Sequence, residues 1–228
     1  VEEAYYEWAI TAYETGRYSE AIEVLLPLVR DDSNLDWKGK VYTLLGESYF
    51  ANKEYSRALE AFNAAEEVTD VDPAIKRQAQ FQKAWVQYSN QAYEQAQPIF
   101  ETLYNDAPDS KLGKEALFWS ADSYYNLEDY GPASAQFSAF IQQYPNHELV
   151  GPANYSLGWS QFKNGNYQSA IDPLITFLEE YEPPEVALYP YDTDTQLRIG
   201  DSYYAISDYS NAIAYYKKAI GAEPGGDY

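Results

Sequence analysis

Residues 41–62 read VYTLLGESYFANKEYSRALEAF, and this stretch contains one complete structural unit. Apolar residues recur at three- and four-residue spacing on both sides of a polar break at residues 52–54, which is the period of an amphipathic helix. The stretch therefore predicts a helix, a tight turn and a second helix. Gly46 and Ala58 lack bulk, so the two helix backbones can approach closely. Phe62, one turn after Ala58, is expected to fill the space beside them.

The same pattern occurs six times along the chain. A small residue is followed twelve positions later by an alanine, in the pairs Ala9/Ala21, Gly46/Ala58, Ala84/Ala96, Ala121/Ala133, Gly158/Ala170 and Gly200/Ala212. Each alanine follows a tyrosine by three residues: Tyr18, Tyr55, Tyr93, Tyr130, Tyr167 and Tyr209. Successive units start 37, 38, 37, 37 and 42 residues apart, and a period in this range is typical of a stacked helical array. We expect the repeats to span about residues 2–35, 39–72, 77–110, 114–147, 151–184 and 193–226.

Glycine, asparagine and proline mark the helix ends. Gly and Asn in the turns suit the left-handed geometry that ends a first helix. Asp72-Pro73 and Ser110 are typical helix starts, and Pro108, Pro145 and Pro224 occupy equivalent positions after second helices. Three further prolines fall inside predicted second helices, where they either tune curvature or are tolerated locally: Pro27, Pro98 and Pro173.

Taken together, the small residue, tyrosine, alanine and terminal proline resemble the tetratricopeptide repeat family, over about residues 2–221. The period departs from the family's usual unit of about 34 residues. The segments 140–147 and 177–184 resemble a long-period subgroup found in bacterial cell-envelope proteins, such as outer-membrane assembly lipoproteins and cell-division coordinators. The resemblance implies an all-α, right-handed superhelix of six repeats that scaffolds protein contacts, in the periplasm or cell envelope.

Composition excludes several classes of function. The 228 residues include no cysteine, which removes disulfides, thiolate metal sites and cysteine nucleophiles. A net charge of −21 argues against nucleic acids and anionic membrane surfaces as partners. The acidic surface indicates either solubility or a high-salt habitat, where self-repulsion is screened. The chain has no methionine and begins inside a helical pattern, so we expect residues 1–228 to be one solenoid domain excised from a longer protein.

The first helices are expected to line a concave groove. If the small residue of each unit is numbered position 8, positions 4, 7, 8 and 11 pack on the second helix, and positions 2, 5, 9, 12 and 13 face the groove. Position 12 is aromatic throughout: Tyr13, Phe50, Tyr88, Tyr125, Phe162 and Tyr204. These rings either form binding platforms or wedge between neighbouring first helices. Position 5 adds Tyr6, Phe81, Phe118 and Tyr155.

Position 9 alternates aromatic and acidic residues. Trp85 and Trp159 alternate with Glu47, Asp122 and Asp201. Because carboxylates are not expected in a packed seam, this pattern predicts aromatic platforms ringed by acids, which suit a basic protein or peptide. The family's pocket for a C-terminal carboxylate needs Lys at position 5 and Asn at position 9, and neither is present here. Chaperone-tail binding of that kind is therefore disfavoured.

Catalysis and cofactors are not expected. His147, the only histidine, lies between units as a helix-start residue, and there is no glycine-rich phosphate loop. Two alternatives remain open. The array could join copies of itself through the C-terminal helix, which carries Ile213, Tyr216 and Ile220. More remotely, Glu47 and Asp122 could form the carboxylate pair of a carbohydrate-active enzyme.

Overall fold

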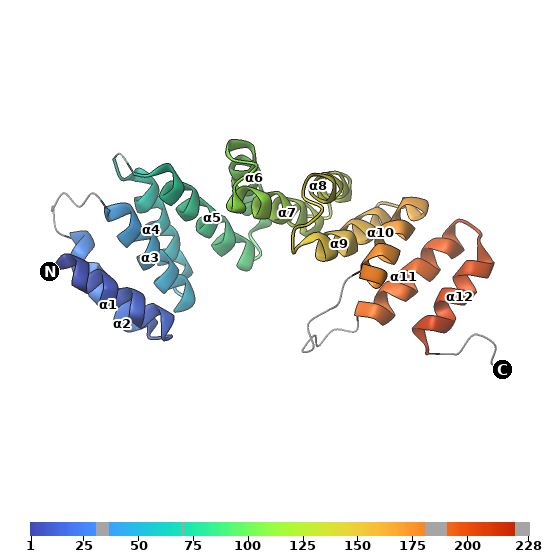
Figure 1. Cartoon of the computed structure of the whole chain (residues 1–228), viewed down its shortest axis with the longest axis horizontal. Coiled ribbons are helices and arrows are strands. Elements are labelled where there is room, and N and C mark those ends of the chain that lie inside the picture. Colours follow the sequence, from blue (N-terminus) through green and yellow to red (C-terminus); the bar gives the residue numbers. More distant parts are fainter. Residues whose placement is uncertain (31–36, 70, 181–190, 222–228) are drawn as a thin grey trace. The chain divides into compact units, whose positions relative to one another are not determined.

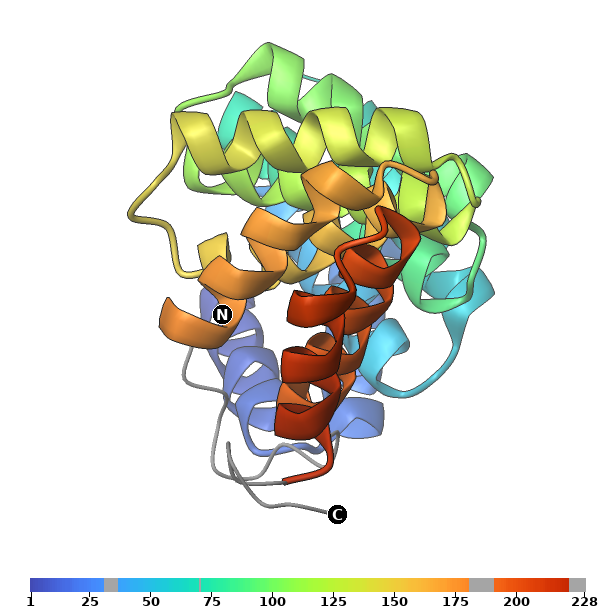
Figure 2. The same ribbon diagram turned by 90° about the vertical axis from the view of Figure 1, so that its right-hand side faces the viewer.

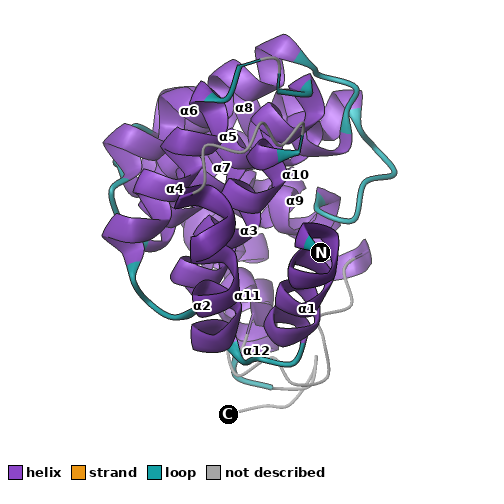
Figure 3. Cartoon of the chain, turned by 90° about the vertical axis from the view of Figure 1, so that its left-hand side faces the viewer, coloured by secondary structure: helices purple, strands orange, loops and turns teal. Residues whose placement is uncertain are grey.

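The computed structural model describes residues 1–30, 37–69, 71–180 and 191–221, and within these ranges it contains twelve α-helices and no strand (Figures 1 and 3). The helices are α1 (Glu2–Glu14), α2 (Tyr18–Arg30), α3 (Lys38–Ala51), α4 (Tyr55–Glu67), α5 (Pro73–Ser89), α6 (Tyr93–Asp106), α7 (Lys111–Asn126), α8 (Tyr130–Gln143), α9 (Val150–Lys163), α10 (Tyr167–Glu180), α11 (Tyr191–Ala205) and α12 (Tyr209–Ala219). Odd-numbered helices are the first helices of the six repeats, and even-numbered helices are the second. The predicted all-α class of helical repeats is confirmed. Pro224, one of the three prolines expected after second helices, lies outside the described residues.

The chain divides into two compact units, residues 1–116 and 117–228, and the division falls inside α7. In the first unit, α3 contacts both α1 and α5, so the first helices lie side by side. In the second unit, α9 and α11 are neighbours in the same way, and α12 lies alongside α11 (Figure 2). Within each unit, second helices also pack on the next first helix: α2 on α3, α4 on α5, α8 on α9 and α10 on α11.

Close contact between the two helices of a repeat depends on the small pair. The alanines of the six pairs are at most 1 % exposed. A Cβ added to Gly46 would lie 2.5 Å from Cε1 of Phe62, and one added to Gly200 would lie 2.6 Å from Cε1 of Tyr216. The predicted role of the small residue, and of the large residue that fills the space beside it, is therefore confirmed.

Every turn between the two helices of a repeat has the same geometry. One residue adopts a positive φ of 60–79°: Gly16, Lys53, Gln91, Glu128, Gly165 and Ser207. The next residue donates its N–H to a carbonyl five residues back, as Glu54 does to Tyr49 at 2.8 Å, which is a Schellman cap. The expectation that glycine and asparagine adopt the left-handed conformation in these turns was right for glycine and wrong for asparagine. Asn52 and Asn90 have φ of −82° and −91°, and the residue after each takes the left-handed conformation.

The predicted helix starts are confirmed at two sites. Asp72 accepts a hydrogen bond from the N–H of Ala74 at 2.8 Å, and Ser110 Oγ accepts one from the N–H of Gly113 at 3.0 Å. These side chains satisfy N–H groups that have no partner inside the helix. The three prolines predicted inside second helices do lie inside α2, α6 and α10.

Candidate functional site

Aromatic residues at position 12 pack within their own repeat. Each contacts the tyrosine that begins the second helix, with ring centroids 5.3–5.7 Å apart. The six pairs are Tyr13–Tyr18, Phe50–Tyr55, Tyr88–Tyr93, Tyr125–Tyr130, Phe162–Tyr167 and Tyr204–Tyr209. We call this contact the turn clasp. The expectation of groove platforms or inter-repeat wedges missed this contact, because it forms when the Schellman turn brings together two residues five apart in sequence.

Two residues predicted for the groove at position 5 are instead core residues. Phe81 is 8 % exposed and packs edge-on against Phe100 at 5.4 Å. Phe118 is 4 % exposed and packs against Phe137 at 5.5 Å. A phenylalanine has no polar tip to keep in water, so a second-helix ring covers it. Tyr155, which shares position 5, remains only half-buried and donates its hydroxyl to Asp194 Oδ2 at 3.1 Å.

Position 9 lies in the seam between neighbouring first helices. Glu47 is half-buried between α3 and α5, where Gln82 donates to its Oε1 at 3.2 Å and Gln78 donates a second hydrogen bond. Burial raises the pKa of Glu47, and these two hydrogen bonds lower it in part. The expectation that carboxylates stay out of this seam is therefore wrong, because amide side chains of the next repeat solvate them.

In the second unit, the side chain of Arg198 covers the ring of Trp159, which was predicted as a binding platform. The guanidinium carbon of Arg198 lies 5.2 Å from the ring centroid of Trp159 and 5.6 Å from that of Phe162. Arg198 also donates to Asp201 at 2.6 Å. Tyr216 donates to the other oxygen of Asp201 at 2.9 Å, and burial together with this bond raises the pKa of Tyr216 to about 12. Trp159 and Asp201 are thus already partnered within the chain.

The remaining predicted groove residues of α5 and α7 have partners within their own helices. Trp85 and Tyr88 stack in α5, with centroids 5.5 Å apart and planes 12° apart. Asp122 in α7 accepts a hydrogen bond from Asn126 at 2.8 Å. Glu47 lies in the first unit and Asp122 in the second.

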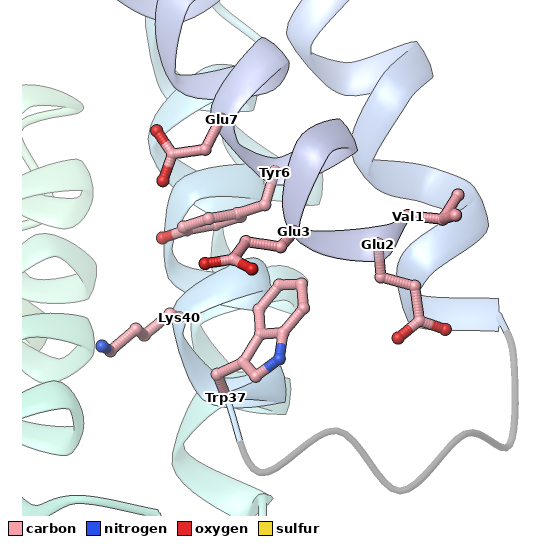
Figure 4. Close-up of a pocket in the computed structure, with 7 residues that line it drawn as sticks. All are labelled: Val1, Glu2, Glu3, Tyr6, Glu7, Trp37 and Lys40. Atoms are coloured by element: carbon pink, nitrogen blue, oxygen red, sulfur yellow. The ribbon is translucent and has the colours of Figure 1, made fainter.

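A groove over the first helices of the first unit brings together two of the predicted residues, Tyr6 and Glu47. One pocket of about 540 Å³ is lined by Val1, Glu2, Glu3, Tyr6, Glu7, Trp37 and Lys40 (Figure 4). A second pocket of about 160 Å³ is lined by Tyr6, Lys40, Thr43, Leu44, Glu47, Ile75 and Gln78. Tyr6 and Lys40 line both pockets, so the two are adjacent. We call them together the α1–α3–α5 groove.

Charge and aromatic rings are concentrated at the α1 end of this groove. The rings of Tyr6 and Trp37 pack at 5.2 Å. Figure 4 shows the carboxylate of Glu3 between these rings in that view, while the side chain of Lys40 extends away from them. The pKa of Tyr6 is raised, first by burial and then by the charges of Glu47 and Glu7. The groove therefore has a negative potential over an aromatic floor.

The sequence analysis missed several residues that line this groove. Glu3, Lys40 and Gln78 are the position 2 residues of three successive repeats. Position 2 belonged to the stripe expected to face the groove, so the signal was present, but only aromatic and acidic positions were selected from it. Trp37 precedes α3 and carries no repeat number, so periodicity could not find it.

The described residues provide neither a metal-binding cluster nor a membrane-spanning helix. Among the described residues, no three His, Cys, Asp or Glu side chains are grouped as metal ligands would be. Within the same part of the chain, every helix is too short or too polar to cross a bilayer. His147 lies half-buried before α9, where its Nδ1 accepts a hydrogen bond from the N–H of Leu149 at 3.2 Å.

Comparison with known families agrees with this architecture. The model of the tetratricopeptide repeat matches residues 6–74 and 155–227, which is more than half of the chain. The chain belongs to the tetratricopeptide repeat family. As a tetratricopeptide repeat protein it is a helical scaffold for protein interactions, a class that is generally non-catalytic. A second family model, described as outer membrane lipoprotein (YfiO), matches residues 73–166.

Solved structures share the fold at low sequence identity. A tetratricopeptide repeat protein from Parabacteroides merdae aligns with a TM-score of 0.70 at 18 % identity, over 98 % of this chain and 80 % of that one. BtubC from P. vanneervenii aligns with a TM-score of 0.66 at 15 % identity, over 93 % of both chains. MamA from Desulfovibrio magneticus aligns with a TM-score of 0.64 at 15 % identity, over 84 % of this chain and 98 % of that one. No curated protein matches the sequence.

Proposed function

We propose that the α1–α3–α5 groove binds a basic peptide segment of a partner protein. The observation that carries this proposal is the pocket over α1, where Glu2, Glu3 and Glu7 surround the Tyr6–Trp37 ring pair. Aromatic side chains are typical anchors of protein interfaces, and carboxylates beside them favour Lys or Arg in the partner. The net charge of −21 would also attract a basic partner over a distance.

The groove can accommodate a Lys or Arg side chain of the partner, with contacts to both its methylene groups and its charge. A Lys or Arg stem can lie on the rings of Tyr6 and Trp37 while its cationic end meets Glu3 or Glu7. A cation over an aromatic face contributes about 0.5–1 kcal/mol at an exposed site. The neighbouring pocket at Glu47 and Gln78 would take an adjacent residue of the same peptide.

An internal contact in the second unit supports this chemistry. Arg198 lies over Trp159 and bonds Asp201, as the proposed ligand would lie over Tyr6 and Trp37 beside glutamates. The contact joins α11 to α9, so in this chain a cation from one repeat is accommodated on the aromatic side chain of its neighbour. A ligand would supply that cation in the first unit.

Peptide binding by fluorescence anisotropy tests the proposal. We expect Lys- and Arg-containing peptides to bind, and the same peptides to bind at least tenfold more weakly after lysine acetylation or to the double variant Glu3→Gln/Glu7→Gln. Glu14→Gln is the matched control, because Glu14 lies at the other end of α1 and does not line the pocket. Equal binding by the double variant, or by acetylated peptides, would contradict the proposal.

We further propose that the protein acts in a bacterial cell envelope. The match of residues 73–166 to an outer membrane lipoprotein family supports this location, as does the absence of cysteine from the sequence. Fractionation of cells that express the full-length protein tests it: recovery in the cytosolic fraction alone would exclude an envelope role.

A further inference from the structure

Large apolar side chains are exposed on two helices, α1 and α12. On α1, Tyr5 and Trp8 are 45 % and 47 % exposed, and their rings stack at 6.3 Å. On α12, Ile213 is 56 % exposed, and Ile220, the residue that caps the C-terminus of this helix, is 72 % exposed. Such exposure is unusual for these residue types when they share a helix face, and it marks interaction surfaces.

The same positions are covered in the other repeats. Trp8 is at position 7, where Leu45, Leu157 and Ile199 are at most 7 % exposed. Ile213 is at position 21, where Ile22 and Ile171 are 7 % and 2 % exposed. Positions 7 and 21 are therefore built for burial, and the exposure on α1 and α12 is the exception.

Position 21 of one repeat meets position 7 of the next. Ile171 of α10 and Ile199 of α11 belong to one buried cluster, together with Leu174. Ile22 of α2 and Leu45 of α3, at the same two positions, also belong to one buried cluster. The exposed faces of α12 and α1 are thus the two complementary halves of this inter-repeat contact.

We propose that α12 of one copy packs against α1 of a second copy, as α10 packs against α11 within one chain. Ile213 would then meet Trp8, in the register of Ile171 and Ile199. Trp8 is already fixed for this contact, because its Nε1 donates to Glu20 at 2.7 Å.

The groove beside Trp8 has room for such a partner. Between α1 and α2 a pocket of about 460 Å³ is lined by residues that include Tyr5, Trp8, Val24 and Leu28. The equivalent groove of the second repeat, between α3 and α4, measures about 220 Å³, and there α2 packs on α3.

Charge complementarity favours a second copy as the occupant. The last turn of α12 carries Lys217 and Lys218, and the groove on α1 and α2 is flanked by Glu2, Glu20 and Glu23. Opposite charges at the rim set the orientation of an interface. Because the two surfaces differ, the association is head-to-tail, and it extends beyond a dimer into rings or open chains.

Sedimentation velocity over a wide range of concentrations tests the proposal with two variants. Trp8→Glu blocks the α1 face and Ile213→Glu blocks the α12 face, and both side chains are exposed enough for the fold to tolerate the change. We expect the unsubstituted chain to form dimers and larger species and each variant alone to remain monomeric. A mixture of the two variants should form a dimer and nothing larger, because each variant keeps one intact face.

The matched control is Ala214→Glu, which places the same charge at a neighbouring exposed position of α12. It should leave association unchanged, because the equivalent residues Glu60 and Asp172 stay exposed although another repeat follows them. Salt of about 0.15 M limits the repulsion between two copies of charge −21. Circular dichroism confirms that each variant is folded. A monomeric unsubstituted chain would overturn the proposal, and so would association that either single variant leaves intact.

Discussion

Phe50 packs against Tyr55 with ring centroids 5.7 Å apart, across a turn in which Lys53 adopts a φ of 64°. The same turn clasp closes all six repeats, although only Gly16 and Gly165 place a glycine at the left-handed residue. Side chains with a Cβ disfavour this conformation. In the other four turns, the ring contact and the Schellman hydrogen bonds therefore stabilise a left-handed conformation that a non-glycine residue disfavours.

Replacing the left-handed residue by glycine should stabilise the chain. We expect Lys53→Gly to raise the free energy of unfolding by about 0.5–1 kcal/mol, because the relief of left-handed strain exceeds the entropy cost of glycine. Gly16→Ala is the opposite change at the equivalent position and should destabilise. Denaturant unfolding followed by circular dichroism measures both. A loss of stability in Lys53→Gly would show that the lysine side chain contributes more than its backbone costs.

The two rings of the clasp should be energetically coupled. A double-mutant cycle with Phe50→Leu and Tyr55→Leu should give a coupling energy of about 0.5–1.5 kcal/mol, which is the value of an aromatic pair beyond its buried area. The same cycle applied to Phe50 and Tyr13, which belong to different clasps, supplies the reference. Coupling no larger than that reference would mean that the rings only cover apolar surface.

Gly46 should not tolerate a methyl group, because Phe62 fills the space beside it. Gly46→Ala places its Cβ 2.5 Å from Phe62, and we expect a loss of about 1–3 kcal/mol from overpacking. Gly131→Ala is the matched control, since an added Cβ there meets nothing within 4 Å. That change should stabilise α8 by about 0.5–1 kcal/mol. Thermal unfolding of the two variants should thus shift in opposite directions.

Neutralising Glu47 should change how stability depends on pH. Because burial raises the pKa of Glu47 in the folded chain, the protonated form is favoured by folding. Its contribution to stability is fully present below the unfolded pKa and is lost as the pH rises through the folded pKa. Glu47→Gln should therefore unfold at a higher temperature than the unsubstituted chain at neutral pH, and the difference should shrink on acidification. Glu14→Gln, an exposed change, supplies the baseline.

Arg198 should contribute more to stability than an exposed arginine with a similar ion pair. Arg198→Met removes the bond to Asp201 and the contact with Trp159, and we expect a loss of about 1.5–3 kcal/mol. Arg57→Met removes an ion pair with Glu54 of 2.7 Å, but the Arg57 side chain is 64 % exposed, so that loss should stay below about 1 kcal/mol. Chemical denaturation compares the two, and equal losses would mean that Arg198 is no better placed than a surface charge.

The sequence predicted the fold well because its determinants are local and repeated. The Gly46–Ala58 spacing depends only on the contact between two adjacent helices, so the same spacing of small residues recurs in the sequence of every repeat. The site was harder to predict because its contacts cross repeats. The surroundings of Glu47 depend on Gln78 and Gln82, more than thirty residues later, and nothing within its own repeat indicates them.

Position 5 shows the same limit. Whether an aromatic side chain there lies in the groove or in the core depends on its second-helix neighbour. Phe81 turns inward onto Phe100, whereas Tyr6 meets Trp37, a residue that precedes α3. Periodicity gives both residues the same position number, so it could not separate them.

The aromatic rings at position 12 form the turn clasp, and the small residue at position 8 allows the two helices of a repeat to pack closely. Both positions therefore stabilise the fold. The side chains over the α1–α3–α5 groove come instead from position 2, and there the three repeats carry Glu3, Lys40 and Gln78, a negative, a positive and a neutral residue. Substitution at these positions alters the surface without touching the contacts that hold a repeat closed. A protein built in this way can acquire a new partner through a few groove mutations while its thermal stability stays nearly constant.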